Sequence, residues 1–267
     1  MSEAAKNTIL SLENISISFS RDYKKDGKEL TESKEILKNI SLKLDEGEIV
    51  ALMGGNGSGK TTLFNIISGL LEADSGNIVF KGKDITFWKA YQRAKAGIGR
   101  MFQDNHIFPN ITVLENMFIS SNSTFGETPF VSLFSRKKSI STERQREQKA
   151  DEILFEIFAG QSGTLLEKRN SLAGELSYGE KRLLGLARIF MGDYRLVLLD
   201  EPSAGINEQL TNNILEMVKK ISNKNITVFL IEHEKTFVLD VSDRVIYLKN
   251  GKITRNAAPA IVLSEIG

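Results

Sequence analysis

The sequence predicts an α/β fold in which helices surround a largely parallel sheet. Two observations predict it. Short apolar strands alternate with amphipathic helices in the first and last thirds of the chain, and a mostly helical stretch occupies the middle, from about residue 111 to residue 160. We therefore expect a single domain, with an α/β core at residues 1–100 and 190–267 and an inserted helical subdomain at about residues 101–189.

The N-terminal part of this core predicts an antiparallel β subdomain. Apolar residues alternate over residues 9–19 and again over residues 36–44, so the second strand should pair back on the first. The charged and turn-rich residues 21–35 between them predict a hairpin tip or a mobile loop.

The remaining elements follow from the spacing of apolar residues. Strands are expected at residues 49–53, 195–199, 226–231 and 244–249, and helices at residues 61–70, 142–159 and 206–221. The second of these helices has a charged first half, and its apolar face is formed by Ala150, Ile153, Leu154, Ile157 and Phe158.

Composition excludes several classes of function. The chain has 267 residues, 41% of them hydrophobic and 26% charged, and its net charge of +1 gives no electrostatic preference for nucleic acid. Cysteine is absent, and the two histidines, His106 and His233, cannot form a His-rich metal cluster. Without a secretory signal or a run of about 18 apolar residues, we expect a cytoplasmic chain that reaches a membrane only through a partner.

A glycine-rich loop follows the apolar run 49–53 and precedes the helical run 61–70. Its glycines let backbone N–H groups surround phosphate oxygens at the start of a helix, whose dipole attracts anions. Lys60 can reach the β- and γ-phosphates of a nucleotide, and the Thr61 hydroxyl can take a Mg²⁺ coordination position. The sequence therefore predicts an ATP and Mg²⁺ site formed by Gly54, Gly55, Asn56, Gly57, Ser58, Gly59, Lys60, Thr61 and Thr62.

Two carboxylates, Asp200 and Glu201, end the apolar run 195–199. They should lie at the C-terminal edge of the sheet, where ligands bind in open α/β sheets. Asp200 suits Mg²⁺, usually through water, and Glu201 suits a base that orients and polarises an attacking water. Alone, this pair would be an ordinary strand end, but the phosphate loop makes a catalytic interpretation the better one.

A third motif indicates a family. Residues Leu176–Glu180, with the sequence Leu-Ser-Tyr-Gly-Glu, resemble the signature motif of ATP-binding-cassette (ABC) proteins. The resemblance extends from about residue 10 to residue 253 and keeps the family's motif order. It implies an ATPase with a phosphate-loop sheet core, an antiparallel β subdomain and an inserted helical subdomain. It also implies roles for Gln103 (glutamine loop), Ser203–Asn207 (the loop after catalytic Glu201) and His233 (switch histidine).

The resemblance further implies a head-to-tail dimer. In such a dimer the signature turn of one chain caps the γ-phosphate of the ATP that Lys60 of the other chain holds, so two ATP molecules lie at the interface. The resemblance implies that Gln103 joins Thr61 and Asp200 as a contact of Mg²⁺ and reports whether the nucleotide site is occupied. The residues implied to act across the dimer are Ser177, Tyr178, Gly179, Glu180 and Asn207.

Four of these positions depart from the commoner family residues. Gly55 stands where many members have proline, so the loop is less rigid but keeps its donors. Tyr178 and Glu180 replace glycine and glutamine, which leaves Ser177 intact for ATP capping. Asn207 replaces aspartate, so it can hydrogen-bond across the dimer but not as an anion.

The adenine base needs an aromatic face. Phe19 is placed where the family carries an aromatic residue near the end of the first strand, and we favour it. Tyr23 is the alternative. His106, which follows Gln103, is interpreted as a loop histidine without a proton-transfer role.

Other motifs resemble one branch of the family, the ATPases of branched-chain amino acid importers. These are residues 97–103, residues 110–116 and an insertion at residues 125–149. ATPases for urea or amide import and for lipopolysaccharide export share some of them. The branch implies integral-membrane permeases, a second ATP-binding subunit and, indirectly, a solute-binding protein as partners, and hence a position on the inner face of the membrane. A soluble ABC ATPase that acts on DNA or ribosomes fits less well, because the chain lacks a long coiled coil or a tandem cassette.

Overall fold

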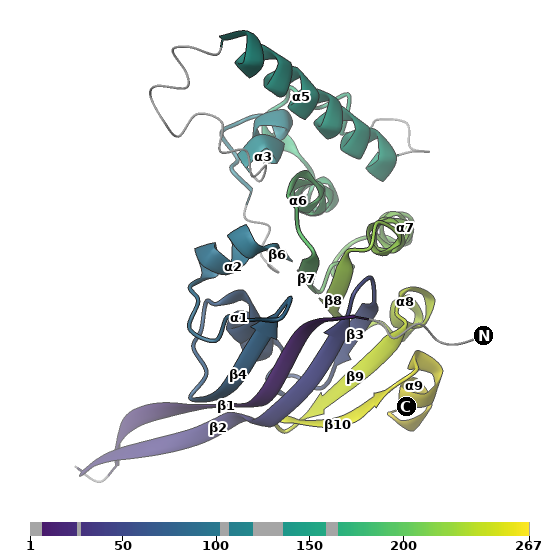
Figure 1. Ribbon diagram of the computed structural model, residues 1–267. Coiled ribbons are helices and arrows are strands. Elements are labelled where there is room, and N and C mark those ends of the chain that lie inside the picture. Colours follow the sequence, from purple (N-terminus) through teal and green to yellow (C-terminus); the bar gives the residue numbers. More distant parts are fainter. Residues whose placement is uncertain (1–6, 26–27, 102–106, 120–135, 159–164, 267) are drawn as a thin grey trace. The chain divides into compact units, whose positions relative to one another are not determined.

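The computed structural model describes residues 7–25, 28–101, 107–119, 136–158 and 165–266. The chain forms two compact units (Figure 1). Unit 1 contains Met1–Arg100, Arg195–Glu201 and Val218–Gly267, and unit 2 contains Met101–Tyr194 and Pro202–Met217. Each unit is described by itself below. The α/β class predicted from the sequence, with its antiparallel β and helical parts, is confirmed.

A six-stranded sheet forms the centre of unit 1. Its order is β10-β9-β3-β8-β7-β6, with β3 (Ile49–Met53) hydrogen-bonded in parallel to β8 (Thr227–Ile231) and to β9 (Arg244–Lys249). β7 (Leu196–Asp200) pairs in parallel with β8, and β6 (Ile98–Met101) is the neighbour of β7. β10 (Lys252–Ala257) closes the other edge antiparallel to β9. Strands β3, β7 and β8 are buried along their whole length, which explains why they are continuous apolar runs in the sequence.

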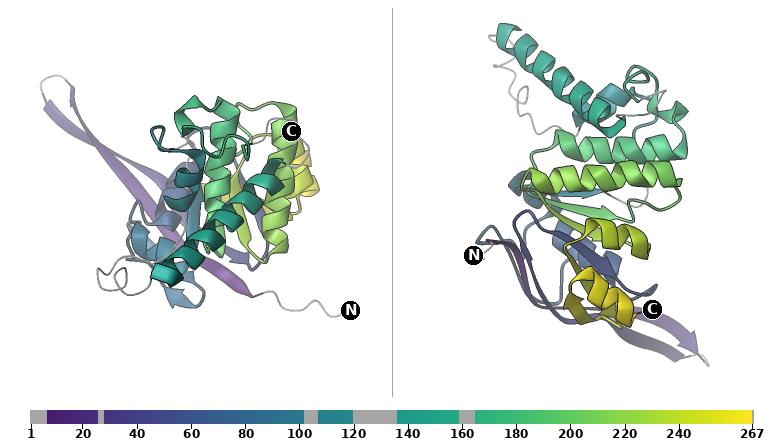
Figure 2. Two further views of the ribbon diagram at one scale, coloured as in Figure 1. Left: turned by 90° about the horizontal axis from the view of Figure 1, so that it is seen from above. Right: turned by 90° about the vertical axis from the view of Figure 1, so that its right-hand side faces the viewer.

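A four-stranded antiparallel sheet completes the β structure of unit 1. Its order is β2-β1-β4-β5, with β1 at Thr8–Lys25, β2 at Lys28–Asp45, β4 at Ser75–Phe80 and β5 at Lys83–Asp84. The ladder of β1 with β4 ends at Ser16, whereas the ladder with β2 continues to the Lys25–Lys28 pair. Beyond Ser16, β1 and β2 therefore form a two-stranded ribbon that runs past the end of β4 (Figures 1 and 2).

Helices cover these sheets and build one apolar core. α1 (Lys60–Ser68) buries Leu63, Phe64, Ile66 and Ile67 in a cluster that contains residues of both sheets. α2 (Ala90–Ala96) is tied to α1 by the buried Arg93, whose Nη1 donates to the carbonyls of Ile66 and Ile67 at 2.6 and 3.0 Å. α8 (Lys235–Val241) and α9 (Pro259–Glu265) complete the unit.

Unit 2 is helical. α3 (Val113–Ile119) and α5 (Arg136–Phe158) both contact α6 (Tyr178–Met191), and α5 lies across α6 in Figure 2. A short 3₁₀ turn, η1 (Ala173–Glu175), precedes α6. α7 (Glu208–Asn223) begins in unit 2, and the boundary between the units falls inside it. None of the described helices has the length and the apolar character that crossing a bilayer requires.

Candidate nucleotide-binding site

The glycine-rich loop joins β3 to α1, as the sequence predicts. Gly54, Gly57 and Gly59 have φ angles of 155°, 73° and 108°, which side-chain-bearing residues rarely adopt. Gly59 is also the N-cap of α1, and no side chain caps that end of the helix. The first N–H groups of α1 and the positive end of its dipole are therefore available for an anion.

Close packing fixes the shape of this loop. A Cβ atom on Gly54 would lie 2.2 Å from the carbonyl oxygen of Leu248, at the end of β9. A Cβ atom on Gly59 would lie 2.6 Å from Cδ2 of Leu37, on β2. The N–H of Gly251, in the turn between β9 and β10, donates to the Ser58 carbonyl at 3.2 Å. Elements distant in the sequence thus hold the loop from two sides.

Lys60 folds back over the loop. Its ammonium group donates to the carbonyl oxygens of Gly54 and Gly55 at 2.8 and 3.1 Å, and the residue is 7% exposed. Burial lowers the pKa of Lys60 from its ordinary value, and the nearby carboxylates of Glu201 and Asp200 act to raise it. A triphosphate would give this buried cation further negative partners.

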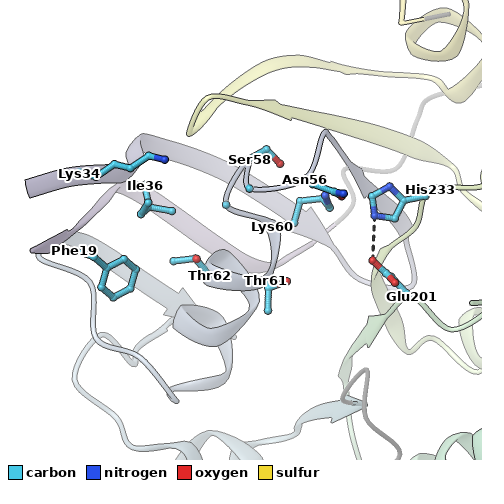
Figure 3. Close-up of a pocket in the computed structure, with 12 residues that line it drawn as sticks. Phe19, Lys34, Ile36, Asn56, Ser58, Lys60, Thr61, Thr62, Glu201 and His233 are labelled. Atoms are coloured by element: carbon cyan, nitrogen blue, oxygen red, sulfur yellow. Dashed lines mark hydrogen bonds and ion pairs between the residues drawn. The ribbon is translucent and has the colours of Figure 1, made fainter. Parts of the chain in front are cut away.

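A pocket of about 350 Å³ opens beside the loop (Figure 3). This volume is within the range of about 300–1,000 Å³ that is usual for small-ligand sites. Figure 3 shows Phe19 at one end of the pocket and the pair of Glu201 and His233 at the other, with Lys60 and Thr62 between them. The lining residues are Phe19, Lys34, Ile36, Asn56, Gly57, Ser58, Gly59, Lys60, Thr61, Thr62, Glu201 and His233.

Glu201 and His233 face each other at one end of this pocket. Nε2 of His233 lies 3.1 Å from Oε1 of Glu201, and Glu201 follows β7 as His233 follows β8. Glu201 has a φ of 49°, a left-handed conformation that costs energy for a residue with a side chain. Its N–H donates to the Ile231 carbonyl at 2.9 Å, which holds the strained residue against the end of β8. The arrangement aims a carboxylate into the pocket.

Asp200 ends β7 and is 3% exposed. Its Oδ2 lies 3.7 Å from Nη2 of Arg100, the next-to-last residue of β6. Motif spacing in the sequence indicates Asp200 but gives no indication of Arg100. Arg100 can be recognised only from the fold, because it approaches Asp200 only when β6 and β7 are neighbours in the sheet.

The residues present fit a small, hard cation that the nucleotide helps to bind. No group of three His, Cys, Asp or Glu side chains that could hold a metal ion occurs in the described part of the chain. Mg²⁺ characteristically uses one or two protein oxygens, with substrate phosphates and water completing its shell. The Thr61 hydroxyl in the pocket and the Asp200 carboxylate at the end of β7 supply such oxygens.

The signature motif forms the start of α6 in unit 2. The Ser177 hydroxyl accepts from the N–H of Glu180 at 3.3 Å, and the Glu180 carboxylate accepts from the N–H of Ser177 at 2.9 Å, so the two residues form a capping box. Lys168 pairs with Glu180 at 2.6 Å. The helix start thus carries a neutralised carboxylate.

The three other residues implied to act across the dimer, Tyr178, Gly179 and Asn207, lie in this turn or close to it. The ring of Tyr178 lies against Gly205, where an added Cβ atom would be 3.2 Å from Cε1 of the ring. An added Cβ atom on Gly179 would lie 2.5 Å from Cδ1 of Leu210. The Asn207 side chain caps α7, since its Oδ1 accepts from the Leu210 N–H at 2.9 Å. Inside unit 2, therefore, the signature turn and the loop before α7 pack together.

The structure thus gathers much of the predicted site in one pocket, namely Phe19, residues 56–62, Glu201 and His233. It adds Lys34 and Ile36, which the sequence analysis missed because their position depends on the register of β1 with β2: Phe19 is the cross-strand partner of Lys34. Gln103 and His106 lie outside the described residues, as do the side chain of Tyr23 and residues 125–135 of the insertion. The proposed dimer-crossing residues belong to unit 2.

Comparison with known proteins points to one family. A sequence model described as "ABC transporter" matches residues 37–204. The chain is 36% identical to the probable branched-chain amino acid transport ATP-binding protein LivG of Methanocaldococcus jannaschii, over 81% of each chain. It is 32% identical to the lipopolysaccharide export system ATP-binding protein LptB of Haemophilus influenzae, over 87% of this chain and 88% of that protein.

A solved structure shows the same architecture. The ADP conformation of an ATP-binding cassette of an ABC transporter superposes with a TM-score of 0.75 at 32% sequence identity. The alignment covers 97% of this chain and 95% of that one.

Proposed function

Because this chain belongs to the ABC transporter family and is one of its transport-coupled ATPases, we propose that it powers the import of branched-chain amino acids as one half of a head-to-tail ATPase dimer. One observation carries the site assignment: the Glu201–His233 pair faces the same pocket as Lys60 and the glycine-rich loop.

Binding begins at the loop. The N–H groups at the start of α1 receive phosphate oxygens, and Lys60 exchanges its bonds to the Gly54 and Gly55 carbonyls for bonds to the β- and γ-phosphates. Phe19 stacks on the adenine base at the other end of the pocket. Thr61 and Asp200, together with Gln103, would hold Mg²⁺, which when bound would neutralise charge on the phosphates.

Hydrolysis then relies on Glu201 and His233. The Glu201 carboxylate orients a water for in-line attack on the γ-phosphate and accepts its proton. His233, 3.1 Å from that carboxylate, holds it in place and contacts the γ-phosphate. The water attacks phosphorus, the bond from the γ-phosphorus to the bridging oxygen breaks, and ADP and phosphate leave.

The dimer supplies the last contact. Ser177 of the partner subunit, at the N-terminus of its α6, caps the γ-phosphate together with the Gly179 N–H of the partner subunit. The two nucleotides then join the chains, and the release of phosphate opens them. Such opening drives membrane permeases that bind the ATPase, which places the chain on the inner face of the membrane. A solute-binding protein delivers the amino acid to those permeases.

The changes Glu201→Gln and Glu72→Gln test this mechanism. Glu201→Gln should abolish phosphate release and yet leave a stable dimer in ATP, measured by size-exclusion chromatography with light scattering. Glu72 pairs with Lys89 on the surface, and Glu72→Gln should behave as the wild type. Unchanged ATPase activity in Glu201→Gln would remove the role assigned to this carboxylate.

The relative LptB supports a second candidate, the ATPase of lipopolysaccharide export, at a comparable level of identity. The two candidates differ in the permease that the ATPase binds. Co-purification from the native membrane, followed by identification of the bound permease, distinguishes them. Stimulation of ATPase activity by a branched-chain amino acid and its binding protein in reconstituted vesicles supports import.

A further inference from the structure

Arg100 carries a guanidinium group that is buried inside unit 1. It is the next-to-last residue of β6, and its side chain is 6% exposed. Burial lowers the pKa of Arg100 from its ordinary value, and the charge of Asp200 acts to raise it. A buried cation is costly unless fixed partners compensate it, so its position calls for an explanation.

The guanidinium is held by the helix that carries Lys60. Its Nη1 donates to Oδ1 of Asn65 at 2.7 Å and to Oγ of Ser68 at 2.8 Å, both on α1. Ser68 in turn donates its own hydroxyl proton to the Phe64 carbonyl at 2.8 Å, so its oxygen is oriented to accept from Arg100. The guanidinium carbon also lies 5.9 Å from the centre of the Phe64 ring. These contacts leave the planar group little freedom.

The other end of the guanidinium faces Asp200. Nη2 lies 3.7 Å from Oδ2 of Asp200, and the two side chains are 6% and 4% exposed. Arg100 thus spans from α1, which begins with Lys60 and Thr61, to the carboxylate at the end of β7. The ion pair thus links that carboxylate to the helix that begins at the phosphate loop.

We propose that Arg100 is a positioning residue that holds the Asp200 carboxylate in the orientation needed to bind Mg²⁺ together with the nucleotide. The proposal rests on the assignment of Asp200 to the metal in the proposed function. Groups that hydrogen-bond or pair with metal-binding carboxylates fix their geometry, and their loss typically weakens metal affinity about 10- to 100-fold. The fixed positive charge of Arg100 also repels an approaching cation. Replacing Arg100 therefore weakens Mg²⁺ binding if positioning of Asp200 dominates, and strengthens it if charge repulsion dominates.

Arg93 provides a matched control. It is also buried, at 2% exposed, and it also contacts α1. Its hydrogen bonds go to backbone carbonyls, those of Ile66, Ile67, Thr86 and Trp88. Arg93 therefore secures the packing of α1 and α2, whereas Arg100 reaches a carboxylate of the site. A purely structural role for Arg100 would make the two arginines equivalent in a metal-binding measurement.

The experiment measures how much Mg²⁺ strengthens nucleotide binding. The Kd of a fluorescent ATP analogue is determined for the full chain with Mg²⁺ and with EDTA. The ratio of the Kd in EDTA to the Kd with Mg²⁺ is then compared among variants. Arg100→Met should lower this ratio about tenfold and leave the Kd in EDTA unchanged. Arg100→Lys should recover part of the ratio, because it keeps the charge but not the planar fork. Arg93→Met should lower the thermal midpoint and leave the ratio unchanged.

The outcomes separate this proposal from the proposed function. If Arg100→Met does not fold, Ser68→Ala, which removes one acceptor of the guanidinium, should lower the ratio to a smaller extent. An unchanged or larger ratio in folded Arg100→Met or in Ser68→Ala overturns the role of Arg100 alone. A wild-type chain whose nucleotide affinity does not depend on Mg²⁺ overturns the metal assignment in the proposed function itself.

Discussion

Nε2 of His233 lies 3.1 Å from Oε1 of Glu201, although the two residues are 32 positions apart in the sequence. They meet because β7 and β8 are parallel neighbours, with Asp200 in register with Ile231, so the residues that follow the two strands leave the sheet at the same edge. The parallel sheet thus assembles a carboxylate and an imidazole beside the phosphate loop.

The contact predicts a specific loss of turnover in His233→Ala. Without the imidazole the Glu201 carboxylate loses a partner that orients it, so kcat should fall at least about 100-fold, while the Kd for ADP, which has no γ-phosphate for His233 to contact, changes little. The neighbouring change Glu234→Gln, on an exposed residue at the start of α8, should leave kcat unchanged. Steady-state phosphate release and equilibrium nucleotide binding check both. A His233→Ala chain with normal kcat would contradict the proposed pairing.

Phe19 provides a test of the adenine end of the pocket. Its ring is 46% exposed and lines the pocket, which suits stacking on a base. Phe19→Ala should weaken ATP binding by about 2 kcal/mol, roughly thirtyfold in Kd, and Phe19→Trp should preserve binding. Phe87→Ala is the matched control, because this residue is also exposed but does not line the pocket. Equal ATP affinity in the two alanine variants would argue against stacking on Phe19.

Gly54 and Gly55 are adjacent but should respond oppositely to alanine. A Cβ atom on Gly54 would meet a backbone carbonyl at 2.2 Å and the residue has a φ of 155°, whereas a Cβ atom on Gly55 would meet nothing within 4 Å. Gly54→Ala should cost about 1–3 kcal/mol of stability through strain and should abolish nucleotide binding. Gly55→Ala should stabilise the chain by about 0.4–1 kcal/mol and still bind ATP. Urea unfolding and nucleotide titration of both variants measure this contrast.

The contacts of Glu180 with Lys168 and Ser177 predict that the stability of the fold depends on pH. Burial acts to raise the pKa of this carboxyl, but its hydrogen bonds with Lys168 and Ser177 outweigh burial and hold the pKa below the ordinary value of 4.5. A lowered pKa means that Glu180 stabilises the fold above its ordinary pKa and loses this effect as the pH falls through its folded-state pKa. Glu180→Gln should therefore cost about 1 kcal/mol at pH 7, and the difference from the wild type should shrink at acidic pH.

Urea unfolding of wild type and Glu180→Gln at several pH values checks this. Glu167→Gln, an exposed carboxylate one position before Lys168, should show no such difference at any pH. A difference between wild type and Glu180→Gln that stays constant from neutral to acidic pH would show that the carboxylate is not stabilised in the way the contacts indicate.

Much of the sheet could be predicted from the sequence because central parallel strands are buried on both faces. β3, β8 and β9 match the predicted ranges to within one residue, and β7 begins and ends one residue later than its predicted range. The strands β4, β5, β6 and β10 were not predicted. β10 is largely exposed and β6 has only four residues, so neither has an apolar pattern that stands out from a loop.

The length of the strands in the β1–β2 hairpin was underestimated for a related reason. The predicted strands end at residue 19 and resume at residue 36, but the ladder continues through charged residues to Lys25 and Lys28. A two-stranded ribbon buries little surface, so its strands need no apolar alternation. Its register then determines that Lys34 and Ile36 join Phe19 in the pocket, which no local pattern could indicate.

The residues of the candidate site likewise fall into two groups, those that sequence motifs indicate and those that only the fold reveals. The glycine-rich loop, Asp200 and Glu201 follow directly from motif spacing, because backbone geometry at a strand end dictates the residue types. His233 required both its motif and the family resemblance. Arg100 was missed, because its role depends on which strand neighbours β7 and on how α1 packs against it.

The position of β3 in its sheet has a consequence for the order in which the protein becomes functional during synthesis. β3 is complete at residue 53, but both of its hydrogen-bonded neighbours, β8 and β9, begin only at Thr227 and Arg244. The turn that donates to Ser58 follows at Gly251. The phosphate loop of a nascent chain is therefore made long before the surrounding sheet exists, and it takes its finished form only when β8, β9 and the turn at Gly251 have left the ribosome.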